Sequence, residues 1–133
     1  GYYSSKYDTN LYNTSISNLT EGEYTLIWSV KNGNCPPVID TVIINIYDSP
    51  VSNAGIDINL CDNYVTNLAS NNPAGTSSGL WAILNGPNSP IIDSVTRYNT
   101  LISGLTEGVY ELEWTVSNGV CPVVKDSILI NIY

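Results

Sequence analysis

Two segments of this chain carry nearly the same sequence. Residues 19–47 and 105–133 align without a gap at an offset of 86 residues, and 18 of the 29 aligned positions are identical. The match continues upstream, because Tyr12-Asn13-Thr14 recurs as Tyr98-Asn99-Thr100. Self-similarity at a fixed period is typical of repeat arrays, which extend a molecule or multiply a weak contact. The repeat therefore constrains both the fold and the function.

The repeat predicts how the chain divides into domains. We expect residues 1–48 to be the C-terminal part of one repeat and residues 49–133 to be a complete repeat, so that the chain is a piece of a longer protein. The join at 47–53 is short and contains one Pro, which favours a semi-rigid, end-to-end connection. Residues 1–48 supply only about three strands, so alone they should leave the face around Trp28 exposed.

Apolar and polar residues alternate along the repeated segment, as they do in an antiparallel strand with one buried face. The inward positions of the two copies are Tyr24, Leu26, Trp28 and Val30, and Tyr110, Leu112, Trp114 and Val116. Asn-Gly follows each strand, at Asn32-Gly33 and at Asn118-Gly119, and predicts a hairpin. No window of about twelve residues keeps a helical apolar stripe, so we expect no helix.

Shorter strand patterns fill the rest of the complete repeat. We expect residues 56–61 and 64–69 to form an opening pair of strands, and residues 79–84 to form a central strand. Residues 96–102 should form a further strand that leads into the last hairpin. Six or seven short strands in about 85 residues predict an all-β, immunoglobulin-like antiparallel sandwich, repeated in tandem. Tyr110 is either the tyrosine of a tyrosine corner or an ordinary half-buried side chain.

The three cysteines fit the repeat. Cys35 and Cys121 occupy equivalent positions, and Cys61 precedes Cys121 by 60 residues. If each repeat carries one bridge of the Cys61–Cys121 kind, the partner of Cys35 lies upstream of residue 1. A reactive thiol or an intermolecular bond at Cys35 is the alternative. Paired cysteines indicate an oxidising, extracytoplasmic compartment.

Composition argues against several classes of function. The chain has four basic and twelve acidic residues, with a formal net charge of −8 at pH 7. Without a Lys/Arg cluster to neutralise phosphate, we expect neither nucleic acid nor anionic lipid as a partner. No apolar run approaches the roughly 20 residues of a membrane span, so we expect no membrane insertion. Because the chain has no histidine, catalysis would have to rest on carboxylates, Ser, Tyr or Cys.

The carboxylates give little support to catalysis. Glu111 and Glu113 share a strand face, but their equivalents in the earlier copy are Thr25 and Ile27, which favours a solvated face. Glu21 and its equivalent Glu107 do recur, inside a corner motif where Glu can satisfy turn amides. We therefore predict a non-enzymatic protein with no catalytic residues and no cofactor.

Binding residues are equally sparse. Asp57 and Asp62 flank the opening strand and are the candidates for calcium at a domain junction, although no dense oxygen-ligand motif surrounds them and we predict no metal site. The tryptophans Trp28, Trp81 and Trp114 are expected to pack in the core rather than to stack on sugars. Exposed tyrosines are the better ligand candidates, and they cluster at Tyr2, Tyr3, Tyr7 and Tyr12.

Four short motifs together resemble a known family. They are N-A-G-x-D…C at 53–61, G-x-W at 79–81, G-L-T-E-G-x-Y at 104–110 and W-T-V-S-N-G-x-C-P at 114–122. This pattern resembles the immunoglobulin-like and PKD-like repeats of very large surface adhesins of gliding bacteria, the SprB-type proteins. Filament-like proteins and accessory domains of secreted enzymes share the pattern.

The resemblance implies several properties. It implies export by the type IX secretion route, display on the cell surface and a Cys61–Cys121 bridge. Bacteria of this group O-glycosylate Asp-Ser/Thr followed by an aliphatic residue, which makes Thr41, Ser94 and Ser127 candidate glycosylation sites; a chance match in a Ser/Thr-rich strand protein is the alternative.

These observations favour a structural or adhesive repeat of a long extracellular adhesin or filament, with neighbouring repeats and surface polysaccharide as expected partners. The alternative is a carbohydrate- or calcium-binding accessory module of a secreted enzyme. A third hypothesis is a filament subunit that completes its half-domain with a strand from a neighbour.

Overall fold

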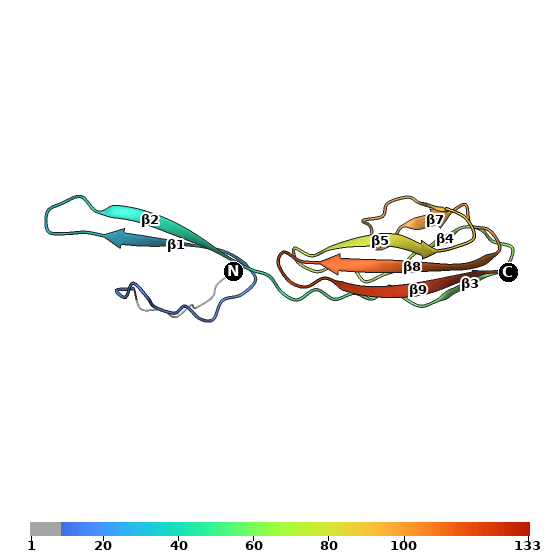
Figure 1. Cartoon of the computed structure of the whole chain (residues 1–133), viewed down its shortest axis with the longest axis horizontal. Helices are drawn as coiled ribbons and strands as arrows, with labels where there is room; N and C mark the ends of the chain where they lie inside the picture. Colours follow the sequence, from blue (N-terminus) through green and yellow to red (C-terminus); the bar gives the residue numbers. More distant parts are fainter. Residues whose placement is uncertain (1–8) are drawn as a thin grey trace. The chain divides into compact units, whose positions relative to one another are not determined.

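The computed structural model of the chain describes residues 9–133. Contacts divide the chain into two compact units, residues 1–48 and residues 49–133 (Figure 1). All regular secondary structure among the described residues is β-strand, and the alternating sequence pattern explains this, because it places apolar side chains on one face of each long strand. The all-β prediction is confirmed.

The described part of the first unit contains one antiparallel hairpin. Strand β1 (Gly22–Val30) pairs with β2 (Val38–Ile46), so that Trp28 lies opposite Asp40. The loop between the strands contains Gly33, whose positive φ of 56° a glycine adopts without steric cost. The hairpin expected at Asn32-Gly33 is therefore present.

The second unit is a sandwich of two sheets (Figure 1). Its strands are β3 (Ile58–Leu60), β4 (Thr66–Asn67), β5 (Ser78–Asn85), β6 (Ile91–Ile92), β7 (Leu101–Ser103), β8 (Gly108–Ser117) and β9 (Val124–Ile132). One sheet has the order β3-β9-β8-β5, and the other has the order β4-β7-β6. Strand β3 runs parallel to β9, and all other pairs are antiparallel. The immunoglobulin-like sandwich is confirmed for this unit.

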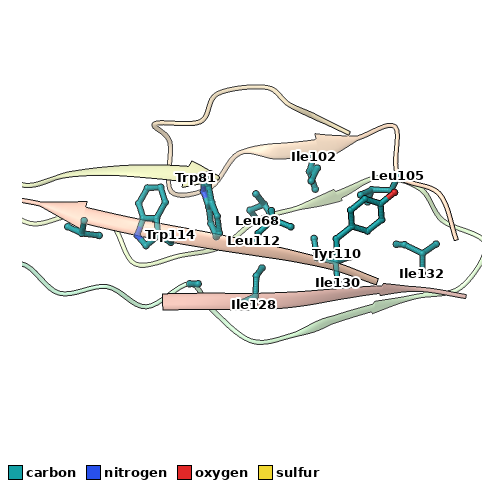
Figure 2. Close-up of a cluster of buried hydrophobic side chains, with 12 residues drawn as sticks. Leu68, Trp81, Ile102, Leu105, Tyr110, Leu112, Trp114, Ile128, Ile130 and Ile132 are labelled. Atoms are coloured by element: carbon teal, nitrogen blue, oxygen red, sulfur yellow. The ribbon is translucent and has the colours of Figure 1, made fainter. Parts of the chain in front are cut away.

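The core lies between the two sheets (Figure 2). Strand β8 alternates strictly, so that every second side chain from Tyr110 to Val116 is buried while the intervening ones reach the surface. Strand β9 contributes isoleucines, and the opposite sheet contributes Leu68 and Ile102. The buried apolar set is Ala54, Leu68, Trp81, Ile102, Leu105, Tyr110, Leu112, Trp114, Val116, Ile128, Ile130 and Ile132.

Three details differ from the sequence-based expectation. The segments 56–61 and 64–69 do not pair with each other, because β3 joins β9 in one sheet while β4 joins β7 in the other. Strand β5 lies at the edge of its sheet rather than at the centre. Of the strand expected at 96–102, only the last two residues are in a strand, as part of β7 (Leu101–Ser103). Strand propensity is a local property, whereas pairing is decided by which sheet edge each segment reaches.

Candidate functional site

The two tryptophans of the second unit are buried in its core and do not form a sugar-binding platform (Figure 2). Their ring centroids lie 5.0 Å apart, with the planes tilted by 42°. The indole N–H of Trp81 donates to the carbonyl of Arg97 at 3.1 Å. The indole N–H of Trp114 donates to Oδ1 of Asn71, also at 3.1 Å. Because both rings are buried and both N–H groups are used internally, neither indole can stack on a ligand.

Tyr110 forms a tyrosine corner. Its hydroxyl oxygen accepts the backbone N–H of Thr106 at 2.8 Å, four residues upstream. The hydroxyl proton is donated to Oδ1 of Asn88, on the loop after β5. The first unit repeats the local half of this arrangement, since the hydroxyl of Tyr24 accepts the N–H of Thr20 at 3.0 Å. The corner therefore belongs to the repeat and fixes the entry into each long strand.

Two aspartates tie the segment before β3 to strand β9. Oδ1 of Asp57 accepts the backbone N–H of Leu129 at 2.9 Å, and Oδ2 of Asp126 accepts the N–H of Ala54 at 2.8 Å. Asp57 is therefore a structural acceptor, whereas the sequence alone presented it as a candidate calcium ligand. Within residues 9–133, no three His, Cys, Asp or Glu side chains gather as metal ligands would.

The carboxylate pair of β8 faces solvent, as the alternation predicts. Glu113 lies 3.6 Å from Nζ of Lys125 on the neighbouring strand. Glu111 accepts a long hydrogen bond of 3.5 Å from the side-chain amide of Asn85. Exposed ion pairs of this kind contribute little to stability, about 0–1 kcal/mol. Glu113 contacts a residue of β9, and Glu111 contacts a residue of β5. The two glutamates therefore resemble side chains of a solvated sheet face and not an acid–base pair.

The cysteines require a correction. Cys61 follows β3, whose last residue Leu60 lies opposite Ile132 at the end of β9. Cys121 lies in the hairpin before the start of β9, so the two cysteines are separated by the length of that strand, on the order of 30 Å for nine residues. A disulfide requires Cα atoms within about 7 Å. No bond joins them in this structure, and the expected Cys61–Cys121 bridge is wrong for this fold.

The candidate glycosylation residues lie on strands and loops near the surface. Thr41 on β2 and Ser127 on β9 occupy equivalent outward positions and are exposed. Ser94 is half-buried, and its backbone N–H donates to Oγ1 of Thr100 at 2.9 Å. The geometry therefore leaves the hydroxyls of Thr41 and Ser127 more accessible than that of Ser94. Modification at all three stays a prediction.

The surface of the second unit carries a groove of about 710 Å³, most of whose surface is apolar. Its lining also includes hydroxyl and amide side chains, one guanidinium and one tyrosine ring. The residues that would face a ligand there include Asn72, Ser78, Arg97, Tyr98, Asn99 and Thr115. Such groups can hydrogen-bond to a polyol, which makes this groove the candidate carbohydrate site of the sandwich.

The first unit exposes the face that its equivalent buries. Trp28, Val30 and Val42 are exposed although they carry the inward pattern of the hairpin. A groove of about 420 Å³ lies over this face, between the hairpin and residues 9–14. Of the tyrosine cluster, only Tyr12 lies within the described residues, where it is exposed; Tyr2, Tyr3 and Tyr7 lie outside them.

One carboxylate at the end of the first unit titrates abnormally. A side-chain hydrogen bond with Glu21, together with the repulsion between the two carboxylates, raises the pKa of Asp48 above its ordinary value. Glu21 lies in the corner before β1, and Asp48 follows the end of β2. The effect is local to the surface and creates no enclosed acid–base site.

The sandwich is similar to solved structures of a known class. The PKD domain from the KIAA 1837 protein, determined in solution, superposes with a TM-score of 0.55 at 21% sequence identity, covering 64% of this chain and 87% of that chain. The sandwich is PKD-like. A nucleoside hydrolase-related hypothetical protein from Saccharophagus degradans, associated with carbohydrate metabolism, gives a TM-score of 0.50 at 17% identity over 63% of this chain. This chain spans only 25% of that protein. No protein-family profile and no curated protein matches the chain.

Two asparagines of the PKD-like sandwich escape sequence reasoning. Asn71 accepts both the indole N–H of Trp114 and the backbone N–H of Asn53, and Asn88 accepts the hydroxyl of Tyr110. Both lie in irregular segments without a motif. Their partners are more than 15 residues away, so no local signal predicts them. They satisfy the polar atoms that the large aromatic side chains carry into the core.

Proposed function

We propose that this chain is part of a non-enzymatic, structural or adhesive repeat of a long extracellular surface protein. The observation that carries this proposal is the pattern of identity between the two copies. Along β1 and β8 every inward residue is the same, whereas the outward residues differ at each of four positions. Those outward pairs are Glu23 and Val109, Thr25 and Glu111, Ile27 and Glu113, and Ser29 and Thr115. The two copies share the residues that build a core.

The use of polar side chains supports the same proposal. In the described residues, no buried side-chain nitrogen or oxygen lacks a hydrogen-bond partner. The conspicuous polar groups, such as Asp57, Asn71 and Asn88, hold backbone or aromatic groups in place. Catalytic sites usually contain polar or charged groups whose burial or repulsion lowers the stability of the fold. In this sandwich these polar groups instead make hydrogen bonds that stabilise the fold.

The finer assignment rests on the motif resemblance. Repeats of SprB-type surface adhesins of gliding bacteria, exported by the type IX route, share the W-x-V-x-N-G-x-C-P pattern that stands here at 114–122. PKD domains are typically extracellular and non-catalytic, which agrees with this assignment. Among residues 9–133, no helix is long and apolar enough to cross a bilayer. In such a protein the repeat would hold binding elements away from the cell surface and would multiply weak contacts by its copy number.

A length measurement tests the spacer role. Chains with one, two and three copies of residues 49–133 would be compared by small-angle X-ray scattering. A spacer with a semi-rigid join predicts that the maximum dimension grows by a constant increment for each added copy. Compact particles whose dimension hardly grows with copy number would contradict it.

The groove of the second unit, with its hydroxyl, amide and guanidinium groups, favours a second candidate function, a carbohydrate-binding accessory module. A glycan array and a calcium titration with the whole chain would test it. Micromolar saturable binding of a sugar, lost on Arg97→Ala and retained on the distant exposed change Glu107→Ala, would favour the binding module over the spacer. No response at millimolar sugar or calcium would leave the structural role as the better account.

A further inference from the structure

The groove of the second unit holds a positive charge within an otherwise acidic unit. Residues 49–133 contain two basic residues, Arg97 and Lys125. Nζ of Lys125 lies 3.6 Å from a carboxylate oxygen of Glu113. Within residues 9–133, the guanidinium of Arg97 makes no hydrogen bond or ion pair, and no Asp or Glu lines the groove. Arg97 is therefore a cation without an anionic partner, at a place that a ligand can reach.

Backbone hydrogen bonds fix the segment that carries this guanidinium. The carbonyl of Arg97 accepts the indole N–H of Trp81 at 3.1 Å, and its N–H donates to the carbonyl of Ser94 at 3.3 Å. The next carbonyl, that of Tyr98, accepts the N–H of Ser70 at 3.0 Å. This wall of the groove is thus formed before a ligand binds, which lowers the entropic cost of binding.

The rest of the lining suits a sugar ring. Apolar side chains offer a surface to the C–H groups of a pyranose, and neighbouring hydroxyl and amide groups can bond to its hydroxyls. The groups of these two kinds include Pro73, Leu80 and Val123, and Ser77, Thr96 and Asn99.

A peptide strand fits this groove less well than a sugar. Strand addition needs free backbone N–H and C=O groups along a sheet edge. Strand β5 contributes residues 78–80 to the lining, and the next N–H on its outer edge, that of Trp81, already donates to the carbonyl of Val95 at 2.7 Å. The edge is closed at this point, so recognition in the groove falls to side chains.

The first copy of the repeat differs at the charged position. Leu11 is the equivalent of Arg97, whereas the Tyr-Asn pair that follows is the same in both copies. The guanidinium is therefore an addition to one copy and not part of the pattern that builds the core. Because the other copy carries leucine there, Arg97→Leu is a substitution that the repeat itself provides.

We propose that this groove binds a sugar residue carrying one carboxylate within an otherwise neutral glycan, and that Arg97 selects the acidic sugar over a neutral one. The guanidinium presents a planar fork of N–H donors that matches the two oxygens of a carboxylate. A polyanion is disfavoured, because the chain has a formal net charge of −8 and the other basic residue of the unit is paired. The proposal rests on the second candidate function, the carbohydrate-binding module, and specifies its ligand.

A matched pair of disaccharides tests the proposal. One is neutral, and the other is the same disaccharide with one hydroxymethyl group oxidised to a carboxylate. Each is titrated into the ¹⁵N-labelled whole chain at neutral pH and low salt. Both should shift the backbone amides of 77–80 and 96–99 in a saturable way, and the acid should bind about three- to tenfold more tightly. Salt at about 1 M should reduce this difference, because it screens an exposed charge pair.

Two variants separate the position of the charge from the net charge. Arg97→Leu should lose the preference for the acid. Lys125→Gln removes the same charge outside the groove and should keep the preference. Unchanged amide shifts along β9 away from residue 125 show that both variants are folded.

The possible outcomes are distinguishable. Equal binding of the two disaccharides to the unchanged chain would overturn selection by Arg97 and leave the carbohydrate-binding module standing. No saturable shift with either disaccharide at millimolar concentration would overturn the module and this proposal together. An acidic peptide that shifts the same amides as tightly as the acidic disaccharide would show a peptide ligand instead of a sugar.

Discussion

At the scale of single residues, the repeat places the same side chain in two different tertiary environments. Trp28 and Trp114 occupy equivalent positions in a shared Leu-x-Trp-x-Val pattern, yet Trp114 is enclosed by a second sheet and donates its indole N–H to Asn71, whereas Trp28 is exposed. The energetic weight of a residue in this chain therefore follows its tertiary environment. Equivalent positions offer matched experiments within one molecule.

The two tryptophans should respond differently to truncation. Trp114→Ala should lower the free energy of unfolding by about 3–5 kcal/mol, because it opens a cavity in a closed core. Trp28→Ala should change it by less than about 1 kcal/mol, because the side chain is already in contact with water. Urea denaturation of the whole chain, followed by circular dichroism, measures both. Equal losses would contradict the different enclosure of the two rings.

Asp57 should matter more than an exposed carboxylate usually does. The hydrogen bond from the N–H of Leu129 to Asp57 ties the segment before β3 to β9. Asp57→Ala should therefore lower the free energy of unfolding by about 1–2 kcal/mol. Glu111→Ala, which loses only a long contact to Asn85, should stay within about 0.5 kcal/mol. Thermal unfolding of the two variants checks the difference, and an unchanged midpoint for Asp57→Ala would count against the structural role.

At the scale of elements, the hairpin with its corner is the unit that recurs. The tyrosine corner is local, because the hydroxyl and the N–H that it accepts are four residues apart, and so it forms in both copies. The rest of the sandwich is not local, since β5 and β3 reach the hairpin from distant parts of the chain. The parallel contact of β3 with β9 also decides the positions of the cysteines.

The carboxylate pair at the base of the first hairpin gives a pH-dependent prediction. Since Glu21 raises the pKa of Asp48, the folded hairpin binds a proton more readily than the unfolded chain. Its stabilising effect is therefore present at low pH and is lost as the pH rises through the folded pKa. Glu21→Gln removes the repulsion and should lower the pKa of Asp48. A carbon-detected NMR titration of the Asp48 carboxyl measures this, and an unchanged or higher pKa would exclude Glu21 as the cause.

The length of β9 gives a prediction about the cysteines. Because Cys61 and Cys121 lie beyond opposite ends of this strand, peptide mapping of the folded chain under non-reducing conditions should find no Cys61–Cys121 bond. The unchanged chain should unfold at the same urea concentration with and without reductant, as the double variant Cys61→Ser/Cys121→Ser must. Recovery of that disulfide from natively folded chain would show that the strand order is different.

At the scale of the whole molecule, the two units bury their apolar residues to different extents. The second unit surrounds its aromatic residues with two sheets, and residues 9–48 of the first unit present a two-stranded sheet with exposed apolar residues. An isolated hairpin is marginally stable in water, because it cannot bury enough apolar surface to offset the entropy of ordering. The stability of the chain therefore resides mainly in residues 49–133.

Hydrogen exchange of the whole chain should show this inequality. The amides of β8 and β9 should exchange slowly, close to the rate set by global unfolding, while those of β1 and β2 should exchange faster through local opening. The comparison is direct because the paired registers are equivalent, from Gly22 opposite Ile46 to Gly108 opposite Ile132. Equal protection of the two hairpins would mean that the first is stabilised by contacts beyond its own sheet.

The sequence by itself determined the features that depend on local pattern. Alternation along residues 108–117 specified a strand with one buried face, Asn118-Gly119 specified the hairpin, and turn signals between short strands specified an all-β sandwich. The tertiary structure alone decided which segments pair, because pairing depends on edges brought together from distant parts of the chain. It placed β3 beside β9 and separated the cysteines by a strand length, and it brought Asn71 and Asn88 to the aromatic residues. It also enclosed Trp114 between two sheets, whereas Trp28, at the equivalent position, is exposed.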